Sequence, residues 1–202
     1  MSKQSQFDFT KDYVLEDDRV ILRPITFSDS QLLTTYVKNE PEIWTYSLVA
    51  IREEEDLKRY IESAIQSRMD KTAYTFIVYD KISQTYVGST RFYDIQLNFQ
   101  TTQLGYTWYS KKVWGTGLNA HCKYLLLQFA FETLQLERVE FRADNNNKRS
   151  IAAMQKIGCK VEGVLRSHMP KPDGGRRDSI VLSITKQDWE QEVKLLIQNR
   201  LQ

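Results

Sequence analysis

The periodicity of the chain changes abruptly near its middle. The segment TTQLGYTWYS (101–110) alternates polar and apolar residues, which predicts a strand. The next segment, VWGTGLNAHCKYLLLQFAFETL (113–134), opens with two glycines and continues with apolar residues at helical spacing. A strand therefore passes directly into a helix through a glycine turn, and any fold of this chain has to accommodate that junction.

Strands and helices are mixed along the rest of the sequence. Period-two runs rich in β-branched and aromatic residues predict strands over 19–25, 73–80, 85–95, 101–110, 138–144, 160–169 and 176–185. Apolar stripes at helical spacing predict helices over 27–39, 52–70, 148–158 and 186–201, besides the one in the central segment. Short links join the three strands between 73 and 110, which favours an antiparallel meander. The sequence predicts an α+β domain.

The bulk composition is that of one globular domain. With 202 residues, 41% of them hydrophobic, and no repeat or linker, we expect a single domain over 19–202 after a loosely packed lead-in at 1–18. A net charge of +2 argues against a non-specific nucleic-acid binder. No signal core or membrane-spanning run stands out, so we expect a cytoplasmic protein. Cys122 and Cys159 lie in apolar surroundings and predict buried thiols without a metal site.

The glycine turn suits an anion. The first turn of a helix leaves about four backbone N–H groups without intrahelical partners, and their dipoles favour negative charge. Gly115 and Gly117 remove Cβ atoms where the oxygens of an anion would approach, and Lys111 and Lys112 add positive charge. This pattern indicates a pyrophosphate site, with a plain tight turn as the alternative.

Two common nucleotide motifs fit this turn poorly. The P-loop requires a lysine immediately after its last glycine, whereas Lys123 lies six residues beyond Gly117. The dinucleotide-binding fingerprint belongs to a parallel βαβ unit, whereas the strands before this turn are expected to be antiparallel. A dehydrogenase or a kinase is therefore disfavoured.

The segment from Lys112 to Arg166 resembles the GNAT acetyltransferases, and most of all their RimJ/RimL-like branch, which acetylates the N-termini of ribosomal proteins. The family's pyrophosphate loop, Q/R-x-x-G-x-G/A, corresponds to residues 112–117, with Lys112 in the place of Gln or Arg. Further residues typical of the branch follow at matching spacing: Asn147, Ser150, Gly158, Glu162, Gly163, Leu165, Arg166, Asp173, Gly174, Asp178 and Trp189. The resemblance extends over about residues 18–190.

The resemblance implies the GNAT fold, a mixed and mostly antiparallel sheet of about seven strands flanked by helices. It also implies direct transfer of acetyl from acetyl-CoA, without a metal, to a protein N-terminal amine or a small-molecule amine. Loop amides would meet the pyrophosphate, and the end of the preceding strand would pair with the pantetheine arm. The implied cofactor residues are Trp108, Tyr109, Lys112, Val113, Trp114, Gly115, Thr116, Gly117, Leu118, Asn119, Asn147 and Ser150. Asn147 could instead simply cap the following helix.

The implied catalytic residues depart from the family pattern. Many GNAT enzymes have a proton-donating tyrosine where this chain has Met154, so the resemblance points to Ser150 as a hydrogen-bond donor to the leaving sulfur. Ser150 could equally be a helix-start serine. Gln103 occupies the position of the branch's glutamate, and an amide cannot take a proton. A water chain, His168 or Glu162 would then act as the base, or the chain is a non-catalytic acyl-CoA-binding module.

Aromatic residues are the candidates for the acceptor site. Trp44 and Tyr46 lie between the first two predicted helices, on the side of the fold where loops carry specificity. Tyr93 lies on a predicted strand and could line the acceptor cleft, although sheet packing explains such residues as well. The resemblance leaves oligomeric state open and makes a homodimer the assembly to test.

Overall fold

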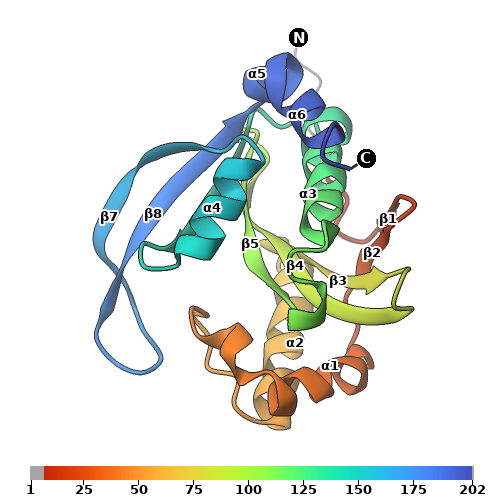
Figure 1. Cartoon of the computed structure of the whole chain (residues 1–202), viewed down its shortest axis with the longest axis vertical. Coiled ribbons are helices and arrows are strands. Elements are labelled where there is room, and N and C mark those ends of the chain that lie inside the picture. Colours follow the sequence, from red (N-terminus) through yellow and green to blue (C-terminus); the bar gives the residue numbers. More distant parts are fainter. Residues whose placement is uncertain (1–6, 202) are drawn as a thin grey trace.

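The computed structural model describes residues 7–201 and contains one eight-stranded sheet with the strand order β1-β2-β3-β4-β5-β6-β8-β7 (Figure 1). The strands are β1 (Leu15–Glu16), β2 (Val20–Pro24), β3 (Ala73–Asp80), β4 (Thr85–Gln96), β5 (Thr101–Tyr109), β6 (Arg138–Asp144), β7 (Lys160–Pro170) and β8 (Arg176–Thr185). The α+β prediction is confirmed, and the sheet is mixed and mostly antiparallel. It exceeds the expected seven strands by the two-residue β1, which is too short to produce a periodic pattern.

Helices cover both faces of the sheet. The helices α1 (Asp29–Asn39) and α2 (Glu54–Met69), joined through the short turn η1 (Pro41–Trp44), pack on one face. The helix α3 (Leu118–Gln128) packs on the other face and widens into a π turn, η3 (Phe129–Thr133). The helix α4 (Lys148–Lys156) follows β6. The expected C-terminal helix forms as three consecutive segments, α5 (Lys186–Asp188), η4 (Trp189–Val193) and α6 (Lys194–Gln198).

The N-terminal residues are more ordered than the sequence indicated. The side chains of Phe7 and Phe9 are buried in the main core, and Phe7 packs edge-on against Tyr74 of β3 at a ring-centroid distance of 5.2 Å. Arg68 of α2 donates to the carbonyl of Phe9. The expectation of loose packing is therefore wrong for residues 7–18, because two aromatic side chains dock them on the domain. Residues 1–6 of the expected lead-in lie outside the described part of the chain.

The pairing of β5 with β6 is short and parallel. It joins only Thr101 to Arg138, Thr102 to Val139 and Gln103 to Glu140, and the strands part beyond these pairs. Every other neighbouring pair in the sheet is antiparallel. The second half of β5, residues 104–109, thus has no strand partner on its β6 side, which leaves backbone groups at that edge available.

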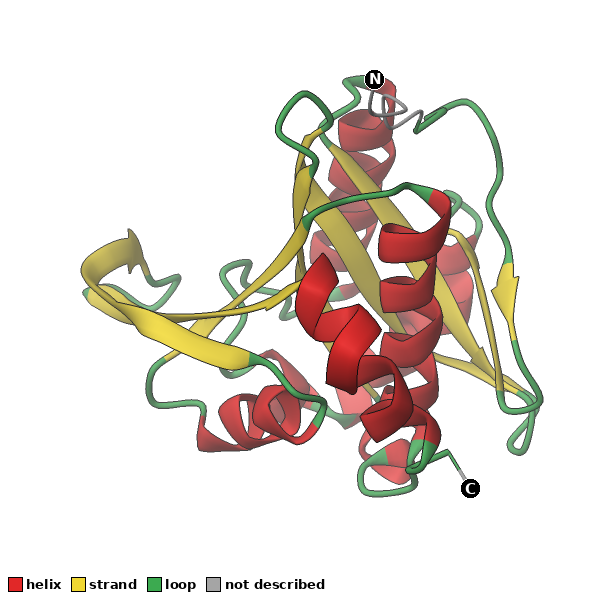
Figure 2. Cartoon of the chain, turned by 90° about the horizontal axis from the view of Figure 1, so that it is seen from above, coloured by secondary structure: helices red, strands yellow, loops and turns green. Residues whose placement is uncertain are grey.

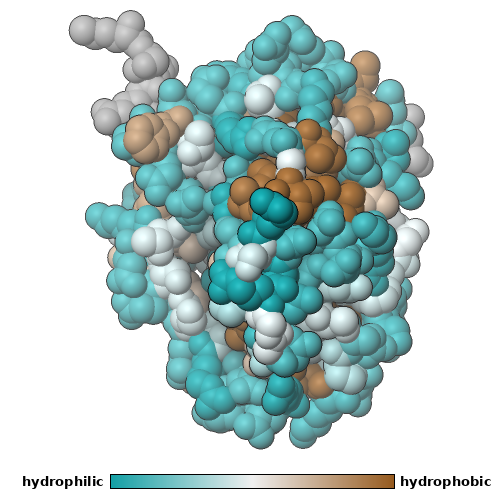
Figure 3. All heavy atoms as spheres, turned by 90° about the vertical axis from the view of Figure 1, so that its left-hand side faces the viewer, coloured by the Kyte–Doolittle hydropathy of each residue, from teal (hydrophilic) through white to brown (hydrophobic). Residues whose placement is uncertain are grey.

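The hairpin of β7 and β8 forms the far edge of the sheet and projects from the body of the molecule (Figure 2). Figure 3 shows the molecule from the side on which β7 lies, and brown, apolar surface is visible on that face. On β7, Val161, Val164 and Leu165 are exposed apolar side chains. Among residues 7–201, no helix combines the length and the apolar character that crossing a membrane requires.

One glycine of β4, Gly88, allows β4 and β5 to approach each other closely near the end of β5. A Cβ added at Gly88 would lie 2.2 Å from the carbonyl oxygen of Trp108 and 3.0 Å from the Cα of Tyr109, both on β5. Because these neighbours are backbone atoms, they cannot turn away as a side chain could. We expect Gly88→Ala to lower the free energy of unfolding by about 1–3 kcal/mol, as overpacking in a core does.

Urea unfolding followed by circular dichroism measures this change. Thr85→Ala, at the exposed start of the same strand, is the control and should stay within about 0.5 kcal/mol of the parent. If Gly88→Ala is as stable as that control, the close approach of β4 and β5 is not a constraint on the fold.

Candidate active site

The loop between β5 and α3 exposes a set of unused backbone donors. Gly115 and Gly117 have φ angles of +76° and +87°, in the left-handed region that favours glycine. An added Cβ at either position would meet no atom within 4 Å, so the space beside both is open. Within the described chain, the N–H groups of residues 115, 117, 118 and 119 donate no hydrogen bond. Four such donors at a helix start beside open space are suited to binding an anion.

Two of the expected loop donors are already used within the loop. The amide of Trp114 donates to the carbonyl of Lys111, and the amide of Thr116 donates to the carbonyl of Val113. Lys112 is exposed and makes no side-chain hydrogen bond or ion pair with a described residue, whereas Lys111 pairs with Glu42. Of the two lysines, only Lys112 thus has a side chain without a competing partner.

The loop is connected to α4 across the gap between the parted strands. The guanidinium carbon of Arg149 lies 3.5 Å from the ring centroid of Trp114, which is within cation–π range. The indole nitrogen of Trp114 donates to the carbonyl of Tyr109 at 2.9 Å, so this one strand-end acceptor is occupied. The loop, the end of β5 and the start of α4 therefore form one connected group.

The start of α4 has the expected cap. Asn147 is the N-cap residue, and its side-chain oxygen accepts a hydrogen bond from the amide of Ser150 at 3.1 Å. The capping interpretation of Asn147 is confirmed, and it does not compete with a ligand contact through the amide nitrogen. The Ser150 hydroxyl is half-buried and makes no side-chain hydrogen bond within residues 7–201.

The residues considered as the general base differ in their hydrogen bonds and ion pairs. Gln103 is buried, and its amide donates to the carboxylate of Asp94 at 2.8 Å. Glu162 is paired with Arg138 and accepts from Ser183, which lowers the pKa of Glu162 to about 2. A carboxylate with so low a pKa is a weak base, so the structure argues against Glu162 in this role.

His168 lies on β7 with both ring nitrogens engaged. Nε2 is 3.4 Å from a guanidinium nitrogen of Arg142, which can only donate, and Nδ1 lies 3.0 Å from the hydroxyl of Ser179. Burial and the nearby charges of Arg142 and Arg177 lower the pKa of His168. Both ring nitrogens already have hydrogen-bond partners, so neither is free to receive a proton from an amine.

The three aromatic acceptor candidates lie in different environments. Trp44 is buried and packs on Trp108 at a ring-centroid distance of 4.6 Å, so its main contact is the core under α1 and α2. Tyr46 is exposed, and its hydroxyl lies 3.5 Å from the carbonyl of Asn146, across the molecule. Tyr93 is half-buried and meets Tyr106 edge-on at 5.1 Å, and burial raises the pKa of Tyr93.

Sequence reasoning missed two residues that shape this region. The buried carboxylate of Glu40, at the end of α1, accepts from the Ser110 hydroxyl at 2.8 Å and from the Lys111 amide at 2.6 Å, which anchors the start of the loop. Lys123 of α3 is buried and donates to the hydroxyl of Thr107, on the unpaired half of β5. Burial lowers the pKa of Lys123 to about 8. A lysine inside an apolar helical stripe was the signal for this second residue.

His121, at the start of α3, pairs with the lead-in. Its Nδ1 lies 2.8 Å from the carboxylate of Asp17, which also accepts from the amides of Arg19 and Val20. This contact joins the segment just before β2 to the start of α3. Cys122 and Cys159 are buried free thiols, as predicted.

Comparison with known proteins gives a consistent result. A family model described as an acetyltransferase (GNAT) domain matches residues 19–160. YoaA of Bacillus subtilis (strain 168), named as an uncharacterized N-acetyltransferase, is 24% identical over 173 residues, which cover 86% of this chain and 97% of YoaA. YdaF of the same organism, provisionally named a ribosomal N-acetyltransferase, is 33% identical over 90 residues, covering 45% of this chain and 48% of YdaF.

A solved structure provides a similar fold. Mycobacterium smegmatis RimJ in complex with CoA-disulfide superposes with a TM-score of 0.78 at 16% identity, covering 93% of both chains. At this identity the likeness bears on the fold alone.

Proposed function

Since the chain belongs to the GNAT acetyltransferase family, we propose that it transfers an acetyl group from acetyl-CoA to an amine acceptor. The expected family is thereby confirmed, and the chain is an acetyltransferase. The proposal for acetyl-CoA is carried by one observation: the four unpartnered amides of residues 115, 117, 118 and 119 beside open space. A diphosphate supplies the acceptor oxygens that these donors lack.

Each part of the site has a task in this reaction. The glycine loop, with Lys112, would hold the pyrophosphate, and the unpaired edge of β5 would hydrogen-bond the amide-bearing arm as an added strand does. Acetyl-CoA supplies the acetyl group as a thioester when it is bound. Positioning of the two reactants is the main contribution expected from these groups, since held reactants avoid much of the entropic cost of meeting.

Two side chains, Ser150 and Asp94, would take part in proton transfer. Ser150, at the start of α4, would donate a hydrogen bond to the departing sulfur. Gln103 cannot take a proton, but the carboxylate of Asp94 is hydrogen-bonded to it and can accept one, directly or through water. Acceptor binding would involve Tyr93 and the exposed Tyr46, while the buried Trp44 would support this region through its packing on Trp108.

The proposal is tested with the purified full-length chain. Calorimetric titration should show binding of acetyl-CoA, and thiol release should follow when amines and peptides with free N-termini are added. Binding without turnover on any acceptor would favour the non-catalytic alternative, for which Gln103 and Met154 are the relevant residues. If no CoA species binds, the proposal is wrong.

The role of Ser150 gives a separate prediction. Ser150→Ala should lower kcat about 10-fold, the size expected for one hydrogen bond of ordinary strength, and leave the Kd for acetyl-CoA within about 2-fold. Steady-state kinetics and calorimetry measure the two quantities. Ser63→Ala, on the exposed side of α2, is the control and should change neither. An unchanged kcat in Ser150→Ala would leave this serine with no part in the transfer.

A further inference from the structure

A buried arginine of β4 has no anionic partner among the described residues. The residue Arg91 is 6% exposed, and among residues 7–201 its guanidinium makes no hydrogen bond and no ion pair. Its Nε and Nη2 atoms are both buried without an acceptor. Buried charges in proteins are almost always paired, because removing an ion from water is costly. This unpaired guanidinium therefore indicates a missing anion.

The surroundings hold the guanidinium in one place. It lies between two tyrosine rings, at 5.2 Å from the centroid of Tyr60 on α2 and 4.5 Å from that of Tyr106 on β5. The hydroxyl of Tyr60 is also buried, and it has no hydrogen-bond partner in the described part of the chain. Cation–π contacts with the two rings position the guanidinium without using its N–H groups as donors to an oxygen, so Nε and Nη2 stay without an acceptor among the described residues.

Arg91 lies on the strand next to β5, near the point where β5 parts from β6. In the sheet it lies opposite Gly105 of β5, two residues from Gln103, where β5 parts from β6. The absent side chain of Gly105 makes room for the ring of Tyr93, since an added Cβ would lie 3.0 Å from that ring. Arg91 and the acceptor candidate Tyr93 thus occupy adjoining positions at the inner end of the gap.

A second buried arginine increases the positive charge there. Arg177 of β8 is 7% exposed, and its Nε donates to the hydroxyl of Ser179. Burial lowers the pKa of Arg177, and the charged and titratable groups near it include Asp144, Tyr93, Tyr106 and Arg142. Asp144 is already approached by Lys171 at 3.7 Å. Arg142 is itself paired with Glu140 at 2.6 Å, so Arg91 and Arg177 are the two buried guanidinium groups near Tyr93 that have no ion pair among residues 7–201, and they favour an anionic ligand.

From the unpaired Arg91 beside the parting of β5 and β6, we infer that the amine acceptor carries a free carboxylate close to its amine, as an α-amino acid does. The planar fork of a guanidinium matches a carboxylate with two parallel hydrogen bonds. The amine of such an acceptor would then lie at the end of the gap where β5 leaves β6. The inference rests on the proposed acetyl transfer and narrows its acceptor to a small amino acid. In a protein N-terminus the corresponding carboxyl is consumed in a peptide bond.

The test compares each of the common L-α-amino acids with its own primary amide. Thiol release from acetyl-CoA should be at least about 30-fold more efficient, in kcat/KM, for the best free acid than for its amide, since truncating one side of a buried charge pair has effects of this size or larger. Arg91→Met should reduce this ratio to within about 3-fold. Equal use of acids and amides, or a preference that persists in Arg91→Met, would overturn the inference.

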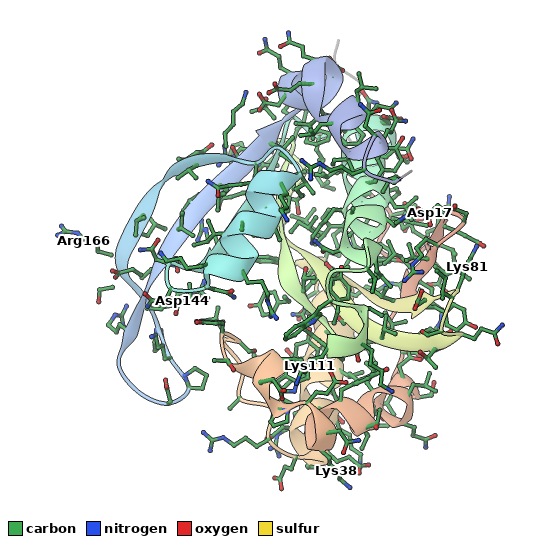
Figure 4. All side chains as sticks on the ribbon, in the orientation of Figure 1. Asp17, Lys38, Lys81, Lys111, Asp144 and Arg166 are labelled. Atoms are coloured by element: carbon green, nitrogen blue, oxygen red, sulfur yellow. The ribbon has the colours of Figure 1, made fainter. Side chains whose placement is uncertain are left out.

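Control variants separate binding from folding. Arg166 on β7 points away from the body of the molecule (Figure 4), and Arg166→Met should keep the full acid-to-amide ratio. If Arg91→Met does not fold, Arg91→Lys keeps the charge but loses the planar fork, and its ratio should fall between those of the parent and an unselective enzyme. An unchanged ratio in Arg91→Lys would also count against the inference.

A binding measurement distinguishes this inference from the proposed function. The N-acetyl form of the best amino acid and the corresponding N-acetyl amide are titrated calorimetrically into the full chain with CoA present. Binding of the acid alone supports the carboxylate contact. If CoA binds and peptides with free N-termini are acetylated with the same efficiency as free amino acids, the proposed transfer stands and the carboxylate inference fails. If CoA does not bind, the proposed function itself fails.

Discussion

Replacing Gly117 by valine is expected to weaken the binding of acetyl-CoA roughly 100-fold, because hydrogen bonds to charged groups contribute about 1.5–3 kcal/mol each and one or two would be lost. Gly117 precedes α3 with a φ of +87°. A β-branched residue cannot adopt this conformation without strain, so the loop would rearrange and its unpartnered amides would no longer converge. Isothermal titration calorimetry measures the change directly.

A second glycine, Gly174, provides a matched control for the backbone strain that a valine causes at a left-handed position. Gly174 also has a left-handed φ, of +94°, but lies in the turn between β7 and β8. Gly174→Val should cost a similar amount of stability and leave the Kd for acetyl-CoA unchanged. If the two variants bind alike, the glycine loop does not hold the cofactor, and the proposed function loses its main support.

Replacing Trp189 by alanine should lower the free energy of unfolding by about 3–5 kcal/mol, the usual cost of removing a fully buried large aromatic side chain. Trp189 is 1% exposed, and its ring stacks on Phe131 at a centroid distance of 5.7 Å. Its indole nitrogen donates to Glu132 at 3.0 Å. Loss of the side chain leaves a cavity between the C-terminal segment and the end of α3.

Denaturant unfolding of Trp189→Ala is compared with that of Phe99→Ala. The phenyl ring of Phe99 is 70% exposed, so its removal should change stability by less than about 0.5 kcal/mol. Equal stability of the two variants would mean that the C-terminal segment does not contribute to the core. Trp189 was noticed in the sequence only as part of a motif, and its main role in the structure is packing.

Local patterns predicted the elements of this fold well. The change from period two to helical period located β5 and α3, and the two glycines located the left-handed turn between them. The Asn147 cap was also readable, because an N-cap depends on residues next to each other in the chain. Each of these features is set by neighbours within about one turn.

Features set by distant neighbours could not be predicted in this way. The parallel pairing of β5 with β6 joins segments separated by α3, and the docking of Phe7 and Phe9 depends on Tyr74 and α2. The carboxylate of Glu40 meets Ser110 seventy positions later. An acidic residue after a helix and an arginine within a strand look ordinary in a sequence, and only their three-dimensional neighbours distinguish Glu40 and Arg91.

The short seam between β5 and β6 has a mechanical consequence. Only three residue pairs form the ladder between a five-stranded and a three-stranded portion of the sheet, with two further backbone hydrogen bonds to the carbonyl of Gln100 at its start. A molecule that lies along the open edge of β5 and also reaches α4 would bridge these two portions beyond the point where the hydrogen bonds between β5 and β6 end. The substrate that donates the acetyl group would then extend the hydrogen bonding between the two portions during each turnover, and its departure would leave the short β5–β6 pairing and the shared core to hold them together.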